Sequence, residues 1–190
     1  MDKQKLLLLL EEEMEKNIIL PLQPASLVFG EGNTNTKILF IGEAPGQKED
    51  ELQRPFVGRS GQLLTRILKE AGILRESVYI TNIVKRRPPE NRDPSPKEIA
   101  AYAPYLTRQI EILHPRVIVP LGRFSMNYFL PDAIISKDQG KLSRVGKYYV
   151  YPIYHPAAAL RSTLMLNAFR KSIQQLPMIV ERCKTHAVRK

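Results

Sequence analysis

The sequence predicts an α/β fold, a three-layer helix–sheet–helix sandwich around a central, mainly parallel four-stranded sheet. Short β-rich runs alternate with helical patterns along the 190 residues, and the first three runs are almost continuously apolar. Apolar runs of this kind are typical of strands covered on both faces. Alternation with helices implies right-handed crossovers between parallel strands. The expected strands are 37–42, 77–84, 116–122 and 148–154.

The expected helices lie between and around these strands. The clearest start is that of 96–113, where Ser95 is a capping residue, Pro96 takes the first helical position and Glu98 lies in the first turn. No repeat, low-complexity tract or linker divides the chain, so we expect a single domain over 1–190 with a basic helical tail over 163–190. The expected helices are 1–16, 61–71, 96–113, 123–130 and 163–183, the last one interrupted at Pro177.

The charge of the chain points to a polyanionic partner. Lys and Arg number 29 against 19 Asp and Glu, a formal net charge of +10, and residues 161–190 hold seven Lys or Arg and one Glu. Nucleic acid is the first candidate partner and an anionic membrane surface the second. The longest apolar run, 6–10, is far shorter than the roughly 20 residues that span a bilayer. We therefore expect no membrane contact, no secretion and a cytoplasmic, nucleoid-associated monomer.

Polar side chains follow three of the expected strands at the point where each strand ends. Glu43 comes directly after the first strand, Asn82 lies at the end of the second, and His155 follows the fourth. Ligands of parallel sheets bind beyond the carboxyl ends of the strands. We therefore expect these three side chains to converge on one rim of the sheet, although they are far apart in the sequence.

Four segments lie at or near these strand ends: GEAPGQKEDELQRPFVGRSGQLL at 42–64, YITNIVKRRPPENRDPSPKEI at 79–99, VIVPLG at 117–122 and YHPAAALR at 154–161. In this order they resemble the uracil-DNA glycosylase superfamily, and most closely its family-4 branch. The resemblance implies a monofunctional enzyme that acts on uracil in single- or double-stranded DNA. Such an enzyme flips the deoxyuridine out, hydrolyses its N-glycosidic bond and leaves an abasic site.

The resemblance gives the residues of this rim specific roles. Asn82 offers an acceptor and a donor that match N3–H and O4 of uracil, and Phe56 offers a flat face for stacking. Gly42 and Gln47 are expected beside the base, with Gln47 where many relatives carry an acidic residue. A second group is expected to be catalytic. His155 would donate to O2 of the leaving uracil, and Glu43 would either steady the sugar cation or orient the attacking water.

Each of these residues also has a simpler structural explanation. Glu43 could cap the following turn, and Asn82 could bond its own backbone. Phe56 could be a core aromatic, and His155, which precedes a proline, could be structural. The order of the four segments favours the functional interpretation for these four residues, and for no other histidine.

Two further segments are expected to hold DNA. In 155–161, Leu160 is the expected apolar wedge that replaces the extruded base and Arg161 the phosphate contact; a leucine packed inward in a helical turn is the alternative. A helix N-terminus would offer backbone N–H groups to a phosphate. Its residues are Gly58, Arg59, Ser60 and Gly61. The basic loop after the second strand would add Arg86, Arg87 and Arg92.

The chain departs from the family-4 pattern in its cysteines. That pattern includes four cysteines that hold a [4Fe–4S] cluster, and the second pair falls here on Arg86 and Tyr102, the first near Glu15 and Ile18. The chain has one cysteine, whereas a cluster needs about four thiolates. We therefore expect no iron–sulfur cluster, no other metal and no organic cofactor. The hypothesis is that Tyr102 fills the vacant space together with Ile18, Ile19 and Leu20.

Other functions stay open from the sequence. The chain could be a catalytically weak or inactive protein that binds DNA or damaged bases, or a glycosylase for another base such as hypoxanthine or mispaired thymine. An unrelated nucleotide-binding protein is the weakest alternative, because neither GxxxxGK[ST] nor GxGxxG occurs. Residues 85–98 contain no histidine, so we expect no covalent bond to DNA, and no lysine nucleophile is marked for a lyase step.

Overall fold

A computed structural model describes residues 2–187 of the chain, with the side chains of residues 2–183. One mixed sheet forms its centre, in the strand order β1-β3-β2-β4-β6-β5. The four inner strands are parallel to one another, and each edge strand is antiparallel to the inner strand beside it. The strands are β1 (Glu31–Gly32), β2 (Ile38–Gly42), β3 (Tyr79–Asn82), β4 (Val117–Pro120), β5 (Ser143–Val145) and β6 (Tyr148–Val150).

The predicted parallel sheet is confirmed, but the number of strands is not. The four expected strands are the four inner ones, and the two edge strands were missed because two or three residues carry too little pattern to stand out. The last expected strand is also too long. It ends at Val150, and beyond Pro152, which has no N–H to donate, only a single bridge between Leu121 and Ile153 continues the pairing.

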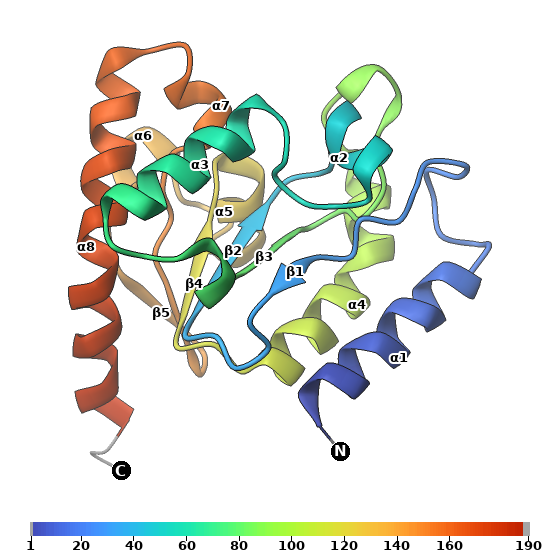
Figure 1. Cartoon of the computed structure of the whole chain (residues 1–190), viewed down its shortest axis with the longest axis horizontal. Helices are drawn as coiled ribbons and strands as arrows, with labels where there is room; N and C mark the ends of the chain where they lie inside the picture. The colour runs from blue at the N-terminus through green and yellow to red at the C-terminus, as the bar shows by residue number, and fades with distance from the viewer. Residues whose placement is uncertain (1, 188–190) are drawn as a thin grey trace.

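Helices cover both faces of the sheet (Figure 1). Alternate residues of β2 point to opposite faces, so that Phe40 joins one apolar core with α3, α7 and α8, and Leu39 joins the other with α1 and α4. The helices are α1 (Lys3–Lys16), α2 (Gln47–Leu52), α3 (Arg59–Glu70), α4 (Pro96–Leu113), α5 (Arg123–Phe129), α6 (Ile135–Asp138), α7 (Pro156–Ala159) and α8 (Thr163–Ala187). This is the expected helix–sheet–helix sandwich.

Two helices test the sequence signals directly. The start of α4 carries a complete capping box, in which the Glu98 N–H donates to Ser95 and the Ser95 N–H donates to the Glu98 carboxylate, as predicted. The predicted interruption of the last helix is wrong, because α8 runs through Pro177. Ile173, Leu176 and Ile179 are buried in the core on both sides of the proline, and this packing offsets the lost backbone hydrogen bond.

The N-terminal helix α1 docks on α4. Leu7, Leu10 and Met14 form its buried stripe, and the Arg108 guanidinium of α4 donates two hydrogen bonds to the Glu13 carboxylate. No helix within residues 2–187 is long and apolar enough to cross a membrane.

Candidate active site at the carboxyl ends of the sheet

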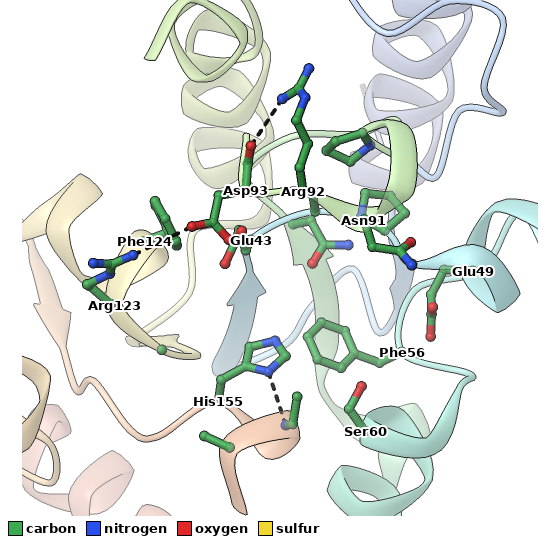
Figure 2. A pocket seen from close by; sticks show the side chains of 18 of the residues that line it. Glu43, Glu49, Phe56, Ser60, Asn91, Arg92, Asp93, Arg123, Phe124 and His155 are labelled. Carbon is green, nitrogen blue, oxygen red and sulfur yellow. Dashed lines mark hydrogen bonds and ion pairs between the residues drawn. The ribbon is translucent and has the colours of Figure 1, made fainter. Parts of the chain in front are cut away.

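A pocket of about 670 Å³ opens beyond the carboxyl ends of β2 and β3. Glu43 follows β2, Asn82 ends β3, and His155 immediately precedes α7. Figure 2 shows Glu43 and His155 together with Phe56 around this pocket, and Asn82 also lines it. The sequence therefore predicted correctly that the three strand-end residues would meet.

Asn82 lines this pocket and is only 1 % exposed. Its side-chain oxygen Oδ1 is buried and has no hydrogen-bond partner. Gly42 lies directly beside it, because a Cβ at that position would stand 2.3 Å from Oδ1 and 2.6 Å from Cζ of Phe56. A buried acceptor without a hydrogen-bond partner lowers stability. A bound molecule that places an N–H group against Oδ1 would supply the missing donor.

Phe56 is held in a backbone conformation that a phenylalanine rarely adopts, with φ at +52°. The carboxylate of Glu49 fixes the segment that follows, since the N–H groups of Val57 and Gly58 donate to Oε1 at N···O distances of 2.8 and 2.7 Å. The Phe56 ring then lies 5.8 Å from the His155 ring between centroids, tilted by 39°. A flat aromatic face is thus presented to the pocket beside the imidazole.

The imidazole of His155 is neutral and its orientation is fixed. Its Nδ1 accepts the N–H of Ala157 at 3.1 Å, so the neutral ring carries its proton on Nε2. Burial lowers the pKa of His155 to about 4, an effect that Glu49 partly opposes. Figure 2 shows the other ring nitrogen directed into the pocket, where it is a hydrogen-bond donor at neutral pH.

Glu43 is the carboxylate with the strongest perturbation in this pocket. Burial and, to a smaller extent, the negative charge of Asp93 raise its pKa to about 7, while the Arg123 guanidinium acts in the opposite direction. A carboxylate with this pKa is a stronger base than an ordinary glutamate and is still ionised in part at neutral pH.

Four polar residues that line the pocket were not predicted from the sequence: Glu49, Asn91, Asp93 and Arg123. Gln47, expected beside the base, does not line the pocket; it is exposed and donates to Glu51 on the outer side of α2. This expectation is corrected, because Glu49, two positions further along the same helix, turns inward instead. A helical periodicity over 47–52 would have indicated which residues face inward, but six residues are too few to predict a helix.

The residues expected to hold DNA do not all reach the pocket. Ser60 and Arg161 line it, and Leu160 is 44 % exposed, which excludes the alternative of a leucine packed inward. Gly61 is buried, since a Cβ there would stand 1.8 Å from the Phe56 carbonyl oxygen. The N–H of Gly58 is taken by Glu49, so within 58–61 the exposed Arg59 and the half-buried Ser60 remain for a phosphate.

The basic loop needs a larger correction. Arg86 was expected to contact DNA, yet its side chain is 3 % exposed and is ion-paired with Glu15 of α1. Burial against α1 removes Arg86 from the DNA-binding rim. Arg87 is half-buried and donates to Asn91 at the pocket edge, and Arg92 is held by two hydrogen bonds to Glu98.

The positions of the family's cluster ligands do not fit a cluster. The Arg86 guanidinium has only donors and is held by Glu15 and by the Ala25 carbonyl. The Tyr102 hydroxyl donates to the Pro21 carbonyl at 2.7 Å. Within the described side chains, no group of three or more His, Cys, Asp or Glu is arranged to hold a metal.

The hypothesis of an apolar filling for this space is wrong in part. Tyr102 and Leu20 are buried in one core, but Ile18 and Ile19 are 85 % and 89 % exposed. The Arg86–Glu15 ion pair takes their place beside Tyr102. Burial raises the pKa of Tyr102 to about 12, and the charges of Arg86 and Glu15 both act on this hydroxyl.

The fold and the site define a class of protein. A parallel sheet with an amide, an aromatic ring, a neutral imidazole and a carboxylate in one pocket beyond its strands suits recognition of a planar base and hydrolysis beside it. The family model described as "Uracil DNA glycosylase superfamily" matches residues 29–176. The chain belongs to this superfamily.

Curated relatives are similar over most of the chain. A protein of Thermotoga maritima named type-4 uracil-DNA glycosylase is 44 % identical over 165 residues, which cover 84 % of this chain and 86 % of that protein. The protein of the same name from Archaeoglobus fulgidus is 47 % identical over 156 residues, which cover 77 % of this chain and 78 % of that protein. The type-4 uracil-DNA glycosylase of Saccharolobus solfataricus is 50 % identical over 143 residues, which cover 69 % of this chain and 65 % of that protein.

Proposed function

We propose that the chain is a uracil-DNA glycosylase that hydrolyses the N-glycosidic bond of deoxyuridine in DNA, releases uracil and leaves an abasic site. The family and the type-4 relatives support this function. The observation that carries it in the structure is the buried, unpartnered Oδ1 of Asn82, a residue that lines the pocket. The N3–H of uracil is the donor that this atom lacks, and the amide NH₂ of Asn82 would serve O4.

Stacking and charge stabilisation complete the proposed chemistry. The Phe56 face receives the flipped base. As the bond between C1′ and N1 breaks, electrons move to the uracil, and the Nε2–H of His155 stabilises the charge that develops on O2. Since His155 is already neutral and oriented, no proton has to be transferred for this contact to form.

Glu43 acts on the sugar side of the bond. Its carboxylate takes a proton from the attacking water or stabilises the oxocarbenium-like sugar, and both roles need the ionised form. The pKa of about 7 favours the first role, because a base with a pKa near the working pH accepts a proton most effectively.

DNA is held by phosphate contacts around the pocket and by one apolar wedge. Leu160 is the wedge, supported by its exposure at the end of α7. Ser60 and Arg161, which line the pocket, and the exposed Arg59 are the proposed phosphate contacts, together with Arg87 of the basic loop. The basic charge of residues 161–190 adds a contact that weakens as salt rises. The glycosylase works as a monomer in the cytoplasm, without a cluster or other cofactor.

One assay tests this function. Labelled single- and double-stranded oligonucleotides that contain U, hypoxanthine, xanthine or a G·T mispair are incubated with the protein and then cleaved with alkali. We expect strand scission at U, and released uracil in equal amount. Retention in a gel shift without scission would identify a binding protein instead, and scission only at another base would identify a different glycosylase.

Asn82→Asp is the variant for this assay, with Asn33→Asp as its control. The acceptor-only carboxylate loses the donor for O4, and we expect at least a tenfold lower rate on uracil. Asn33 is exposed and lies outside the pocket, and its Oδ1 accepts the N–H of Asn35, a role that an aspartate keeps. Parental activity of Asn82→Asp would exclude the proposed role of Asn82.

A further inference from the structure

Two charged residues beside Glu43 have no role in the proposed function. Asp93 lies on the loop between β3 and α4, and Arg123 begins α5. Both line the pocket with Glu43, and Nη2 of Arg123 lies 3.7 Å from Oδ2 of Asp93. Figure 2 shows this ion pair at the Glu43 side of the pocket. One negative and one positive charge from separate elements thus flank the same carboxylate.

The loop that carries Asp93 is held in place. The Arg92 guanidinium donates to the Asp93 carbonyl at 3.0 Å and makes two hydrogen bonds with Glu98. Glu98 is in turn part of the capping box of α4, and the hydrogen bonds from Arg92 hold its pKa at about 2. Asp93 is therefore anchored through its backbone, and its carboxylate, paired with Arg123, lies on the Glu43 side of the pocket.

We propose that Asp93 and Arg123 are a pair of positioning residues whose opposite charges tune the Glu43 carboxylate for hydrolysis. The proposal rests on the proposed function of the pocket. Asp93 makes the Glu43 carboxylate hold a proton more tightly and so makes it a stronger base. Arg123 limits this effect, so that enough Glu43 stays ionised at neutral pH. These effects agree with the charges, since Asp93 raises the pKa of Glu43 and Arg123 lowers it.

The other ionisable groups around the pocket are engaged elsewhere or lie at its margin. Glu49 is bonded to the backbone before α3, and Arg92 is paired with Glu98. His155 is neutral above a pKa of about 4. The ionisable groups that line the pocket with Glu43 are Glu49, Arg92, Asp93, Arg123, His155 and Arg161.

The pH dependence of single-turnover uracil release tests the pair. Activity should rise with pH as Glu43 ionises. Asp93→Asn removes a negative charge and should move this rise to lower pH by about half a pH unit, which is what a unit charge at a distance of about 6 Å produces in a water-like dielectric. Arg123→Gln should move it to higher pH, and Arg123→Lys should keep it at the parental position. The double variant should fall between the two single ones.

Glu90→Gln is the matched control, since Glu90 is an exposed acid of the same loop that does not line the pocket. A ¹³C-detected NMR titration of the Glu43 carboxyl in the free protein supplies a readout that needs no turnover. Shifts of opposite sign in Asp93→Asn and Arg123→Gln, absent in Glu90→Gln, support the proposal. Equal shifts in all three, or none in the first two, would overturn it. Absence of uracil release by the parental protein would instead count against the proposed function, and the NMR titration would still test the pair.

Discussion

The guanidinium of Arg86 lies 2.9 Å from the carboxylate of Glu15 and joins the loop after β3 to helix α1. The Arg86 side chain is 3 % exposed and that of Glu15 is 59 % exposed. A buried guanidinium that loses its partner keeps the cost of its burial. The pair therefore supplies a cross-link between elements at the positions where the family-4 pattern has cysteines.

Glu15→Gln should lower the free energy of unfolding by about 1–2 kcal/mol, because Arg86 loses a charge-assisted hydrogen bond. Urea unfolding measures this change. Glu12→Gln is the control, since Glu12 makes only an exposed, 3.7 Å pair with Lys16 and should cost less than about 0.5 kcal/mol. Uracil release should be unchanged in both variants, and equal stability of both would contradict a structural role for the pair.

Glu49→Ala should destabilise the protein by about 1–3 kcal/mol, because the N–H groups of Val57 and Gly58 lose their acceptor. Uracil release should fall as well, since the Phe56 ring is no longer fixed. Thermal unfolding and single-turnover rates measure the two effects. The control is Glu51→Ala on the exposed side of the same helix, and a similar loss in both variants would contradict the anchoring role.

His155→Ala should reduce the rate of bond cleavage about 10²- to 10³-fold, the usual cost of removing a donor that acts on developing charge. DNA affinity should change little, so the loss should appear in the single-turnover rate and not in a gel shift. His114→Asn is the control, because His114 ends α4 with φ at +49° and asparagine tolerates that conformation. A parental rate for His155→Ala would rule out the proposed contact with O2.

Glu43→Gln should make the protein more stable at high pH while it abolishes most of the activity. The folded-state pKa of Glu43 is raised to about 7 from an ordinary value of 4.5. Between pH 4.5 and 7, Glu43 is largely ionised in the unfolded chain but still largely protonated in the folded one. The native state therefore loses stability as the pH rises through this range. We expect a gain of about 1–2 kcal/mol for Glu43→Gln at pH 8.5, allowing for solvent screening.

At pH 4.5 and below the gain should largely disappear, because Glu43 is then protonated in the folded state and increasingly so in the unfolded one. Urea unfolding at several pH values measures this trend. Glu111→Gln, an exposed site on α4, should show no such dependence. A gain for Glu43→Gln that grew toward acid pH would contradict the raised pKa.

The parts of the site that sequence reasoning found share one physical origin. Asn82 and His155 were placed correctly because parallel strands fix where their carboxyl ends meet. Strand direction does not determine which side of a short helix faces the pocket. In α2, Glu49 faces the pocket and Gln47 does not. Nor does strand direction determine whether an arginine of a basic loop is solvated, and Arg86 is buried because α1 docks beside it.

The order of strands, helices and caps, the parallel sheet and the rim that carries Glu43, Asn82 and His155 follow from the sequence alone, because periodicity and strand direction are local properties of the chain. The tertiary structure decided the edge strands, the burial of Arg86, the inward turn of Glu49 and the charges that flank Glu43. These depend on contacts between segments distant in the sequence, such as the 71 positions that separate Glu15 from Arg86. Burial and electrostatics at such contacts arise only once the layers have packed.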